Sequence, residues 1–138
     1  MPRAVLDTNV LVSVLFSPQG PSARLLLELR AGAFELIISP MLLDELREVL
    51  LRDKFRPYVT EREVGTYLEL IGSEGLVYDD LETSTEPVGP DPDDEYVIDL
   101  ARVARADGLV SGDAHLLDLR DILRVMSPAE FLASLGDD

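Results

Sequence analysis

Short apolar runs alternate with helical patterns along this chain. The runs are rich in Leu, Ile and Val and lie near residues 3–6, 35–38, 76–78, 108–110 and 123–126. Helical patterns fill most of the space between them, near residues 21–31, 40–52, 60–73, 96–106 and 128–135. This alternation favours a parallel sheet flanked by helices over an all-helical or all-β fold. We therefore predict a three-layer α/β/α fold with a central parallel sheet of about five short strands.

Capping residues mark the start of two of these helices. Ser39 followed by Pro40 is an N-cap with proline at the first helical position, and Thr60 with Glu63 fits a capping box. The length of 138 residues suits one compact domain over residues 1–138. No apolar run approaches the roughly 20 residues that a membrane span needs. We therefore expect a cytoplasmic protein that does not associate with membranes.

Carboxylates stand where two of the predicted strands end. Asp7 directly follows the run at 3–6, and Asp113 follows the run at 108–110. In α/β folds, ligands are held at the carboxyl ends of the strands. The alternative for Asp7 is a plain helix N-cap. We interpret both residues as candidate site residues.

Helical geometry distinguishes between two adjacent acids, Asp44 and Glu45. The buried stripe of the helix from 40 to 52 consists of Leu42, Leu46, Val49 and Leu50. At about 100° per residue, Asp44 points nearly opposite this stripe, whereas Glu45 lies at its border. Glu45 is therefore the candidate that reaches a cleft.

The same test applies to the acidic segment 91–95, which leads into the helix over 96–106. Asp94 aligns with the apolar face of this helix, while Glu95 diverges from it. The alternative is that these acids only complement the helix dipole. We predict Asp94 as a ligand, with Asp93 or Asp91 assisting it.

The residue types limit any metal site to oxygen ligands, because the chain has no cysteine and one histidine. Four clustered carboxylates repel one another and are stable only when protonated or when a cation is bound. Mg²⁺ and Mn²⁺ suit such ligands. The natural chemistry of this site is metal-assisted phosphodiester hydrolysis.

The net charge of −15 is unusual for a nucleic-acid-binding protein. Residues 79–95 contain eight acids and no base, so the rest of the chain carries −7. RNA binding would therefore need bound metal and local basic groups. The candidates for RNA contact are four residues near the end of the Glu45 helix: Arg47, Arg52, Lys54 and Arg56. A solvated helix end is the alternative for this cluster, and a basic protein partner is an alternative user of the acidic surface.

Four motifs occur in order along the chain. They are Leu6 to Val10, Ser39-Pro40 leading to Glu45, Asp91 to Asp94, and Val110 to Asp113 with Leu116-Leu117. Together they resemble the PIN-domain family, and in particular its bacterial and archaeal branch of toxins from toxin–antitoxin systems, the VapC type.

The resemblance implies a Mg²⁺- or Mn²⁺-dependent endoribonuclease that acts on single-stranded RNA. Its acidic site would consist of Asp7, Glu45, Asp94 and Asp113, with Asp93 as the alternative third acid. Supporting polar groups would be Thr8, Asn9 and Ser111. The resemblance also implies a homodimer and a cognate antitoxin that holds the enzyme inactive.

Two competing hypotheses remain at this point. A phosphatase of the haloacid-dehalogenase type also begins with an aspartate after the first strand, and Gly112-Asp113 to Asp118 matches its late motif. Its general acid would be an aspartate at position 9, where this chain has Asn9. A non-catalytic binding module for a basic antitoxin segment is the second alternative, which retention of all four acids disfavours.

Overall fold

The computed structural model describes residues 1–80, 95–120 and 124–136. Five parallel strands form one sheet in the order β3-β2-β1-β4-β5. In chain order the strands are β1 (Arg3–Leu6), β2 (Glu35–Ile38), β3 (Gly75–Val77), β4 (Gly108–Val110) and β5 (Val125–Met126). The predicted parallel α/β fold is confirmed.

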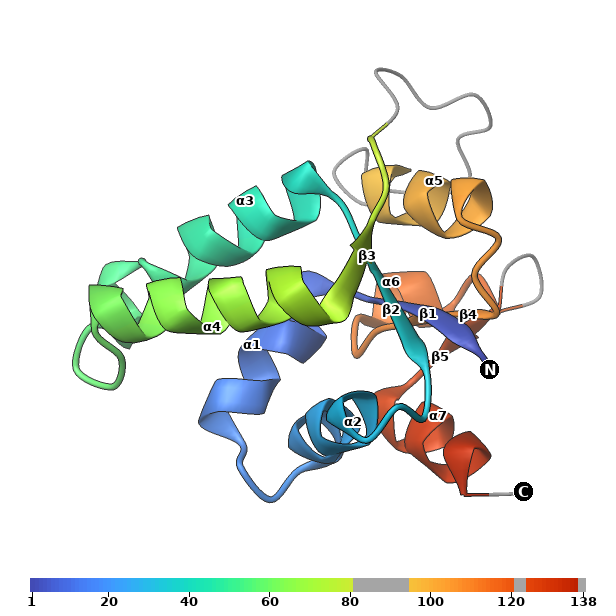
Figure 1. Cartoon of the computed structure of the whole chain (residues 1–138), viewed down its shortest axis with the longest axis horizontal. Helices are drawn as coiled ribbons and strands as arrows, with labels where there is room; N and C mark the ends of the chain where they lie inside the picture. Colours follow the sequence, from blue (N-terminus) through green and yellow to red (C-terminus); the bar gives the residue numbers. More distant parts are fainter. Residues whose placement is uncertain (81–94, 121–123, 137–138) are drawn as a thin grey trace.

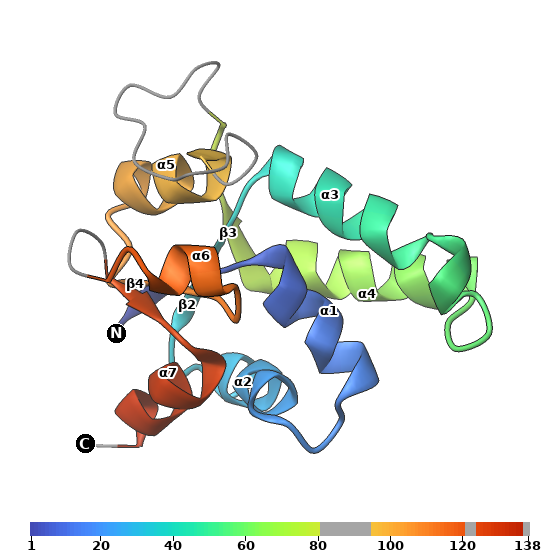
Figure 2. The ribbon, with the colours of Figure 1, turned by 180° about the vertical axis from the view of Figure 1, so that it is seen from behind.

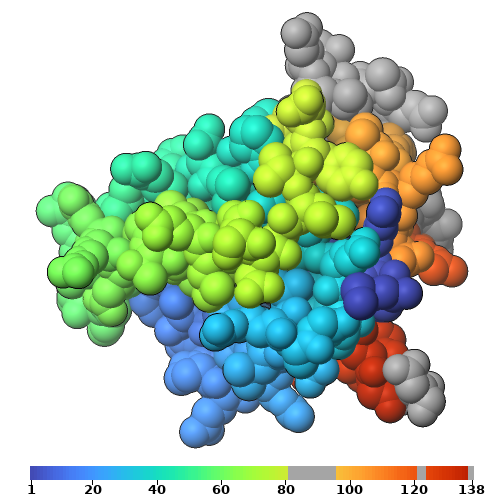
Figure 3. All heavy atoms as spheres, in the orientation of Figure 1, coloured from blue at the N-terminus to red at the C-terminus, as the bar shows by residue number. Residues whose placement is uncertain are grey.

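Helices cover both faces of the sheet. They are α1 (Thr8–Phe16), α2 (Pro21–Arg30), α3 (Pro40–Leu50), α4 (Glu61–Glu74), α5 (Glu95–Val103), α6 (Ala114–Leu117) and α7 (Pro128–Leu135), with a 3-10 turn, η1, at Asp53–Phe55. In two opposite views, α5 lies on one side of the strands, and α2 and α7 lie on the other (Figures 1 and 2). Helices α3 and α4 form a hairpin whose tip protrudes from the body of the molecule (Figure 3).

The predicted helix starts are present and are held by side-chain caps. The Ser39 hydroxyl accepts a hydrogen bond of 3.2 Å from the Leu42 amide at the start of α3. Thr60 and Glu63 form a reciprocal capping box at the start of α4. Each cap satisfies amide groups that would otherwise have no partner within the helix.

Helix α5 ends earlier than the sequence pattern predicts, at Val103 and not at Ala106. The backbone of Arg105 has a φ of 52°, which is left-handed. The Ala106 amide donates to the Ala101 carbonyl at 2.8 Å, which is the 6→1 bond of a Schellman motif. The helical spacing of apolar residues continues to Ala106, beyond the left-handed turn at Arg105. The sequence pattern therefore predicts a helix that is too long.

The core fills both sides of the sheet, as expected for parallel strands covered by helices. Ala4, Val5 and Leu6 of β1 are buried, as are residues 36–38 of β2. On the α2 side, the rings of Phe34 and Phe131 meet edge to face at 5.0 Å and anchor α7. Strand β1 pairs with β2 on one side and with β4 on the other, so it is the central strand of the sheet.

Within the described ranges, no single helix is long and apolar enough to cross a membrane. Helices α1 and α2 meet the criteria of length and composition only as a pair, which bends by 97° at the break between them.

Candidate active site

The carboxyl ends of β1 and β4 lie side by side and bring together residues about one hundred positions apart. The two strands pair with Leu6 opposite Val110, and the Asp7 amide donates to the Val110 carbonyl at 2.9 Å. Asp7 and Ser111 each follow directly after one of these strands. In parallel α/β sheets this edge is where ligands bind.

Asp7 is almost completely buried, with 9 % of its surface exposed, and both carboxylate oxygens have partners. Oδ1 accepts from the Thr8 amide at 2.8 Å, so Asp7 is the N-cap of α1. Oδ2 accepts from the Ser111 hydroxyl at 2.9 Å and from the Asn9 side-chain amide at 3.3 Å. Asp7 is therefore an N-cap through Oδ1, whereas Oδ2 contacts Ser111 at the end of β4.

Burial raises the pKa of Asp7, and the nearby charge of Asp113 raises it further. Hydrogen bonds from Ser111 and from the Thr8 amide oppose this shift. Burial and the charge of Asp113 thus disfavour the ionised form of Asp7, and the two hydrogen bonds offset only part of this effect. A bound cation would supply the missing compensation.

Asp113 is linked to Asp7 through Ser111. The Asp113 amide donates to the Ser111 hydroxyl oxygen at 3.0 Å, and that hydroxyl donates to Asp7. Asp113 Oδ1 accepts from the His115 amide at 2.9 Å, which caps the short helix α6. Asn9 adds a second link, because its Oδ1 accepts from the Gly112 amide at 3.3 Å.

Glu45 reaches the same edge from α3. Its side chain is half-buried, whereas the neighbouring Asp44 is exposed. Glu45 Oε2 accepts from the Thr8 hydroxyl at 3.0 Å and from the Tyr96 hydroxyl. Because Thr8 follows Asp7 directly, these bonds hold Glu45 beside the β1 end of the site.

Tyr96 is a site residue that the sequence analysis missed. It lies on the first turn of α5, and its hydroxyl contacts both Glu45 and, at 3.4 Å, Thr8. Its place directly after the acidic segment is the one signal in the sequence that points to it. Asp99, one turn further along α5, is also buried, and its Oδ1 lies 4.0 Å from the guanidinium of Arg102.

The donor set suits a hard divalent cation but is incomplete in the part of the chain that the structure describes. Asp7, Glu45 and Asp113 offer only oxygen atoms, as Mg²⁺ and Mn²⁺ prefer. Among the described residues, no three acidic or histidine side chains are close enough to hold a metal together. The predicted third acid, Asp94, and its alternative Asp93 lie outside the described residues.

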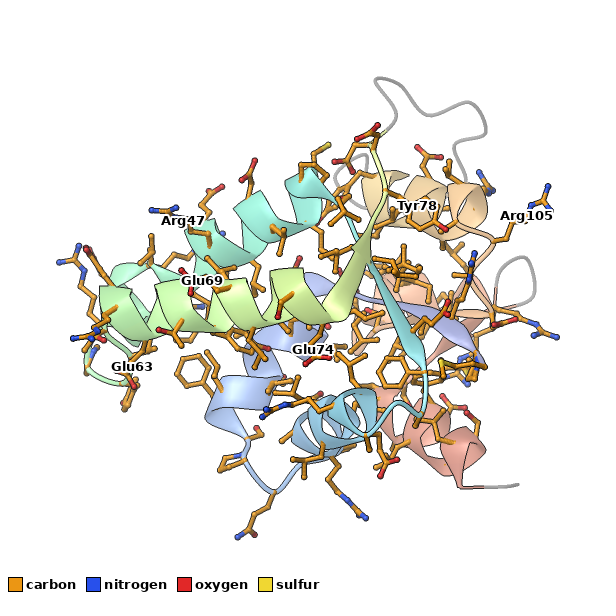
Figure 4. All side chains as sticks on the ribbon, in the orientation of Figure 1. Arg47, Glu63, Glu69, Glu74, Tyr78 and Arg105 are labelled. Atoms are coloured by element: carbon orange, nitrogen blue, oxygen red, sulfur yellow. The ribbon has the colours of Figure 1, made fainter. Side chains whose placement is uncertain are left out.

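The predicted RNA-contacting cluster lies away from this edge, toward the tip of the α3–α4 hairpin (Figure 1). Arg47 projects from α3 (Figure 4), and Arg52 precedes η1. Two members have local partners: Arg56 pairs with Asp53 at 3.3 Å, and the Lys54 ammonium lies 5.0 Å from the centre of the Phe55 ring. The structure therefore does not bring this cluster together with the acids.

A family model described as "PIN domain" matches residues 3–115 of the chain. The chain is 28% identical over 141 residues to the uncharacterized protein MJ1680 of Methanocaldococcus jannaschii, covering 94% of this chain and 89% of that protein.

Two solved structures have a similar fold. PAE2754 from Pyrobaculum aerophilum aligns with a TM-score of 0.68 and 15% identity, over 99% of this chain and 97% of that one. VapBC2 from Rickettsia felis, solved with a DNA fragment from its promoter, aligns with a TM-score of 0.60 and 18% identity. That alignment covers 91% of this chain and 98% of the other.

Proposed function

The chain belongs to the PIN domain family, and from this premise we propose that it is a Mg²⁺- or Mn²⁺-dependent endoribonuclease that cleaves single-stranded RNA. PIN domains are generally nucleases. We further propose that residues 1–138 act as a single nuclease domain and that the protein is the cytoplasmic toxin of a toxin–antitoxin pair.

The link between Asp7 and Asp113 through Ser111 is the observation that carries this proposal. It joins the carboxylate of Asp7 to the backbone amide of Asp113 at the carboxyl ends of neighbouring strands, and Glu45 comes to the same edge through Thr8. Carboxylates gathered at one edge favour cation binding, because a cation reduces their mutual repulsion. Asp7 already shows this repulsion, since the charge of Asp113 raises its pKa.

Asp7, Glu45 and Asp113 would hold the metal, together with Asp94, which stays a prediction from the sequence. When bound, a divalent cation activates water and neutralises the scissile phosphate. The protein orients the ligands: Ser111 and Asn9 fix one oxygen of Asp7, and Thr8 and Tyr96 fix Glu45. Such outer hydrogen bonds determine the geometry of metal ligands.

We propose a homodimer and a cognate antitoxin as the protein partners. The structural similarity to VapBC2 supports an antitoxin, because that structure is a toxin–antitoxin assembly. The net charge of −15 supports a basic segment as the part of the antitoxin that binds here.

The test is cleavage of a labelled single-stranded RNA with Mn²⁺, by the wild type and by Asp7→Asn purified in parallel. Asp118→Asn is the matched control, because Asp118 is an exposed acid at the end of α6. We expect cleavage by the wild type and the control, loss of cleavage in Asp7→Asn, and loss with EDTA.

Other outcomes would contradict the proposal. Equal cleavage by wild type and Asp7→Asn would show that the activity comes from a contaminant or from another site. Turnover of a phosphomonoester without RNA cleavage would favour the phosphatase. A folded protein that binds no Mn²⁺ in calorimetry and cleaves no RNA would be a binding module.

A further inference from the structure

A cavity of about 260 Å³ lies between α5 and the amino ends of β4 and β5. Three arginines line it together with apolar side chains: Arg102, Arg105 and Arg124, with Ile98, Ala101 and Leu109 among the apolar residues. The chain has only 12 basic residues against 27 acids, so three bases around one cavity are a marked concentration. We name this cavity the arginine pocket.

The arginine pocket lies at the amino ends of the strands, whereas Asp7 lies at their carboxyl ends. Gly108 begins β4, and Arg124 directly precedes β5, whereas the acidic site follows the ends of β1 and β4. Gly108 and Asp113 are five residues apart, so their Cα atoms are separated by no more than about 18 Å. At about 3.4 Å per stacked nucleotide, roughly five nucleotides cover this distance.

The three arginines differ in how far nearby carboxylates neutralise them. Arg102 lies 4.0 Å from Asp99. Arg105 and Arg124 are exposed, and within the described ranges neither guanidinium has a carboxylate partner. Asp107, the acid nearest in sequence, accepts a hydrogen bond from the Arg3 amide at 2.7 Å. The arginine pocket therefore has two guanidinium groups, those of Arg105 and Arg124, that no carboxylate in the described ranges pairs with.

The backbone of Arg105 is unusual for a residue with a side chain. Its φ of 52° is the left-handed conformation that glycine normally adopts at the end of a helix. Arg105 projects outward from the end of α5, on the opposite side of the molecule from Arg47 (Figure 4). The helix dipole favours cations at this end of α5, but it does not account for Arg124, which comes from the segment before β5.

We propose that the arginine pocket binds a phosphate group of the RNA outside the cleavage site. Guanidinium groups match phosphate oxygens with paired hydrogen bonds, and the apolar wall suits a ribose or base. The volume of about 260 Å³ is below the roughly 300–1,000 Å³ that is typical of ligand pockets, so it suits one small group and not a longer segment. The inference rests on the proposed function, and it gives a strongly acidic protein a local anchor for a polyanion.

RNA binding by Asp7→Asn protein tests the proposal without cleavage of the probe. The affinity of a labelled single-stranded RNA is measured by fluorescence anisotropy at several salt concentrations. Three additional substitutions are compared in this background: Arg105→Gly, Arg124→Gln and Arg30→Ala. Arg30 is the matched control, because it is exposed, carries the same charge and belongs to α2 on the other side of the sheet.

We expect Arg105→Gly and Arg124→Gln each to weaken RNA binding about tenfold, and Arg30→Ala to have little effect. The slope of log K against log salt concentration should fall in magnitude by about 0.7 for each lost phosphate contact. Arg105→Gly should keep or raise the melting temperature, because glycine favours the backbone conformation there. Weaker binding by this variant would therefore not reflect unfolding.

Unchanged affinity and salt slope in both arginine variants would overturn the inference, as would an absence of RNA binding in the Asp7→Asn background. Binding of a labelled poly-glutamate peptide is measured in the same way. If both arginine variants bind RNA normally but no longer bind this peptide, the pocket belongs to an acidic protein partner. RNA binding that depends on the pocket, without cleavage by the wild type, would contradict the proposed function alone. Cleavage with RNA binding independent of the pocket would contradict this inference alone.

Discussion

The Ser111 hydroxyl donates a hydrogen bond of 2.9 Å to Asp7 Oδ2, joining residues 104 positions apart in the chain. The same hydroxyl oxygen accepts from the Asp113 amide at 3.0 Å, and Ser111 is completely buried. Ser111 thus fixes the backbone amide of Asp113 relative to the carboxylate of Asp7.

Asp7→Asn should stabilise the metal-free fold. Burial raises the pKa of Asp7, so its ionised form costs stability. Below the unfolded pKa of about 3.9 the carboxyl is protonated in both states and the cost is absent. The cost grows as the pH rises and is complete above the folded pKa. The melting temperature of Asp7→Asn in EDTA should therefore exceed that of the wild type at pH 7, and the two should converge toward pH 4. A lower melting temperature at pH 7 would contradict this account.

Ser111→Ala should raise the pKa of Asp7 further, because the Ser111 hydrogen bond lowers it. We expect metal-dependent RNA cleavage to fall about tenfold or more, as for other residues that support metal ligands. The rise of activity with pH should move to higher pH. Ser22→Ala is a suitable control, because Ser22 is also buried but lies on α2. A pH profile that does not move would exclude this role for Ser111.

Tyr96→Phe should lower activity about 10- to 100-fold with little change in stability, because it removes a donor to Glu45. Tyr67→Phe should do the opposite. The buried Tyr67 hydroxyl donates to the Leu11 carbonyl at 2.6 Å, and its loss should cost about 1–2 kcal/mol of unfolding free energy without a direct effect on cleavage. Denaturant unfolding and single-turnover cleavage of the two variants would measure both effects. Equal activity loss in both would mean that Tyr96 acts only through the fold.

Glu45→Gln and Asp44→Asn form a matched pair on adjacent residues of α3. Glu45 contacts Thr8 and Tyr96, whereas Asp44 is exposed. We expect Glu45→Gln to reduce cleavage by about 100-fold or more and to weaken Mn²⁺ binding, because a carboxylate ligand contributes more than the outer groups. Asp44→Asn should stay within about twofold of the wild type, since a solvated charge contributes little. Similar losses in both variants would contradict the placement of Glu45.

Much of the fold was predictable because local signals agree with the tertiary structure. The runs at 3–6, 35–38 and 108–110 are strands over the predicted residues, since burial on both faces requires continuous apolar sequence. Ser39 and Thr60 begin helices as their chemistry requires. The end of α5 was not predictable, because Arg105 adopts a backbone conformation that sequence rules reserve for glycine.

The site was predictable only in part. Asp7 and Asp113 stand out because each follows a strand, and parallel strands place their carboxyl ends together. Tyr96 was missed because a tyrosine near the apolar face of a helix is usually a core residue. Only the folded chain shows that its hydroxyl contacts Glu45. The roles of these acids in cleavage stay predictions, and Asp94 lies outside the described residues.

The strand order has a consequence for synthesis of the protein. The central strand β1 is made before its neighbour β4, which follows about one hundred residues later. Contacts between such distant segments form late, because a long chain must close before they are made. Asp7 therefore cannot meet Ser111 and Asp113 until translation has passed residue 113. A chain that stops before β4 carries Asp7 and Glu45 but not Asp113, so the cell is exposed to the assembled site only after β4 has been made.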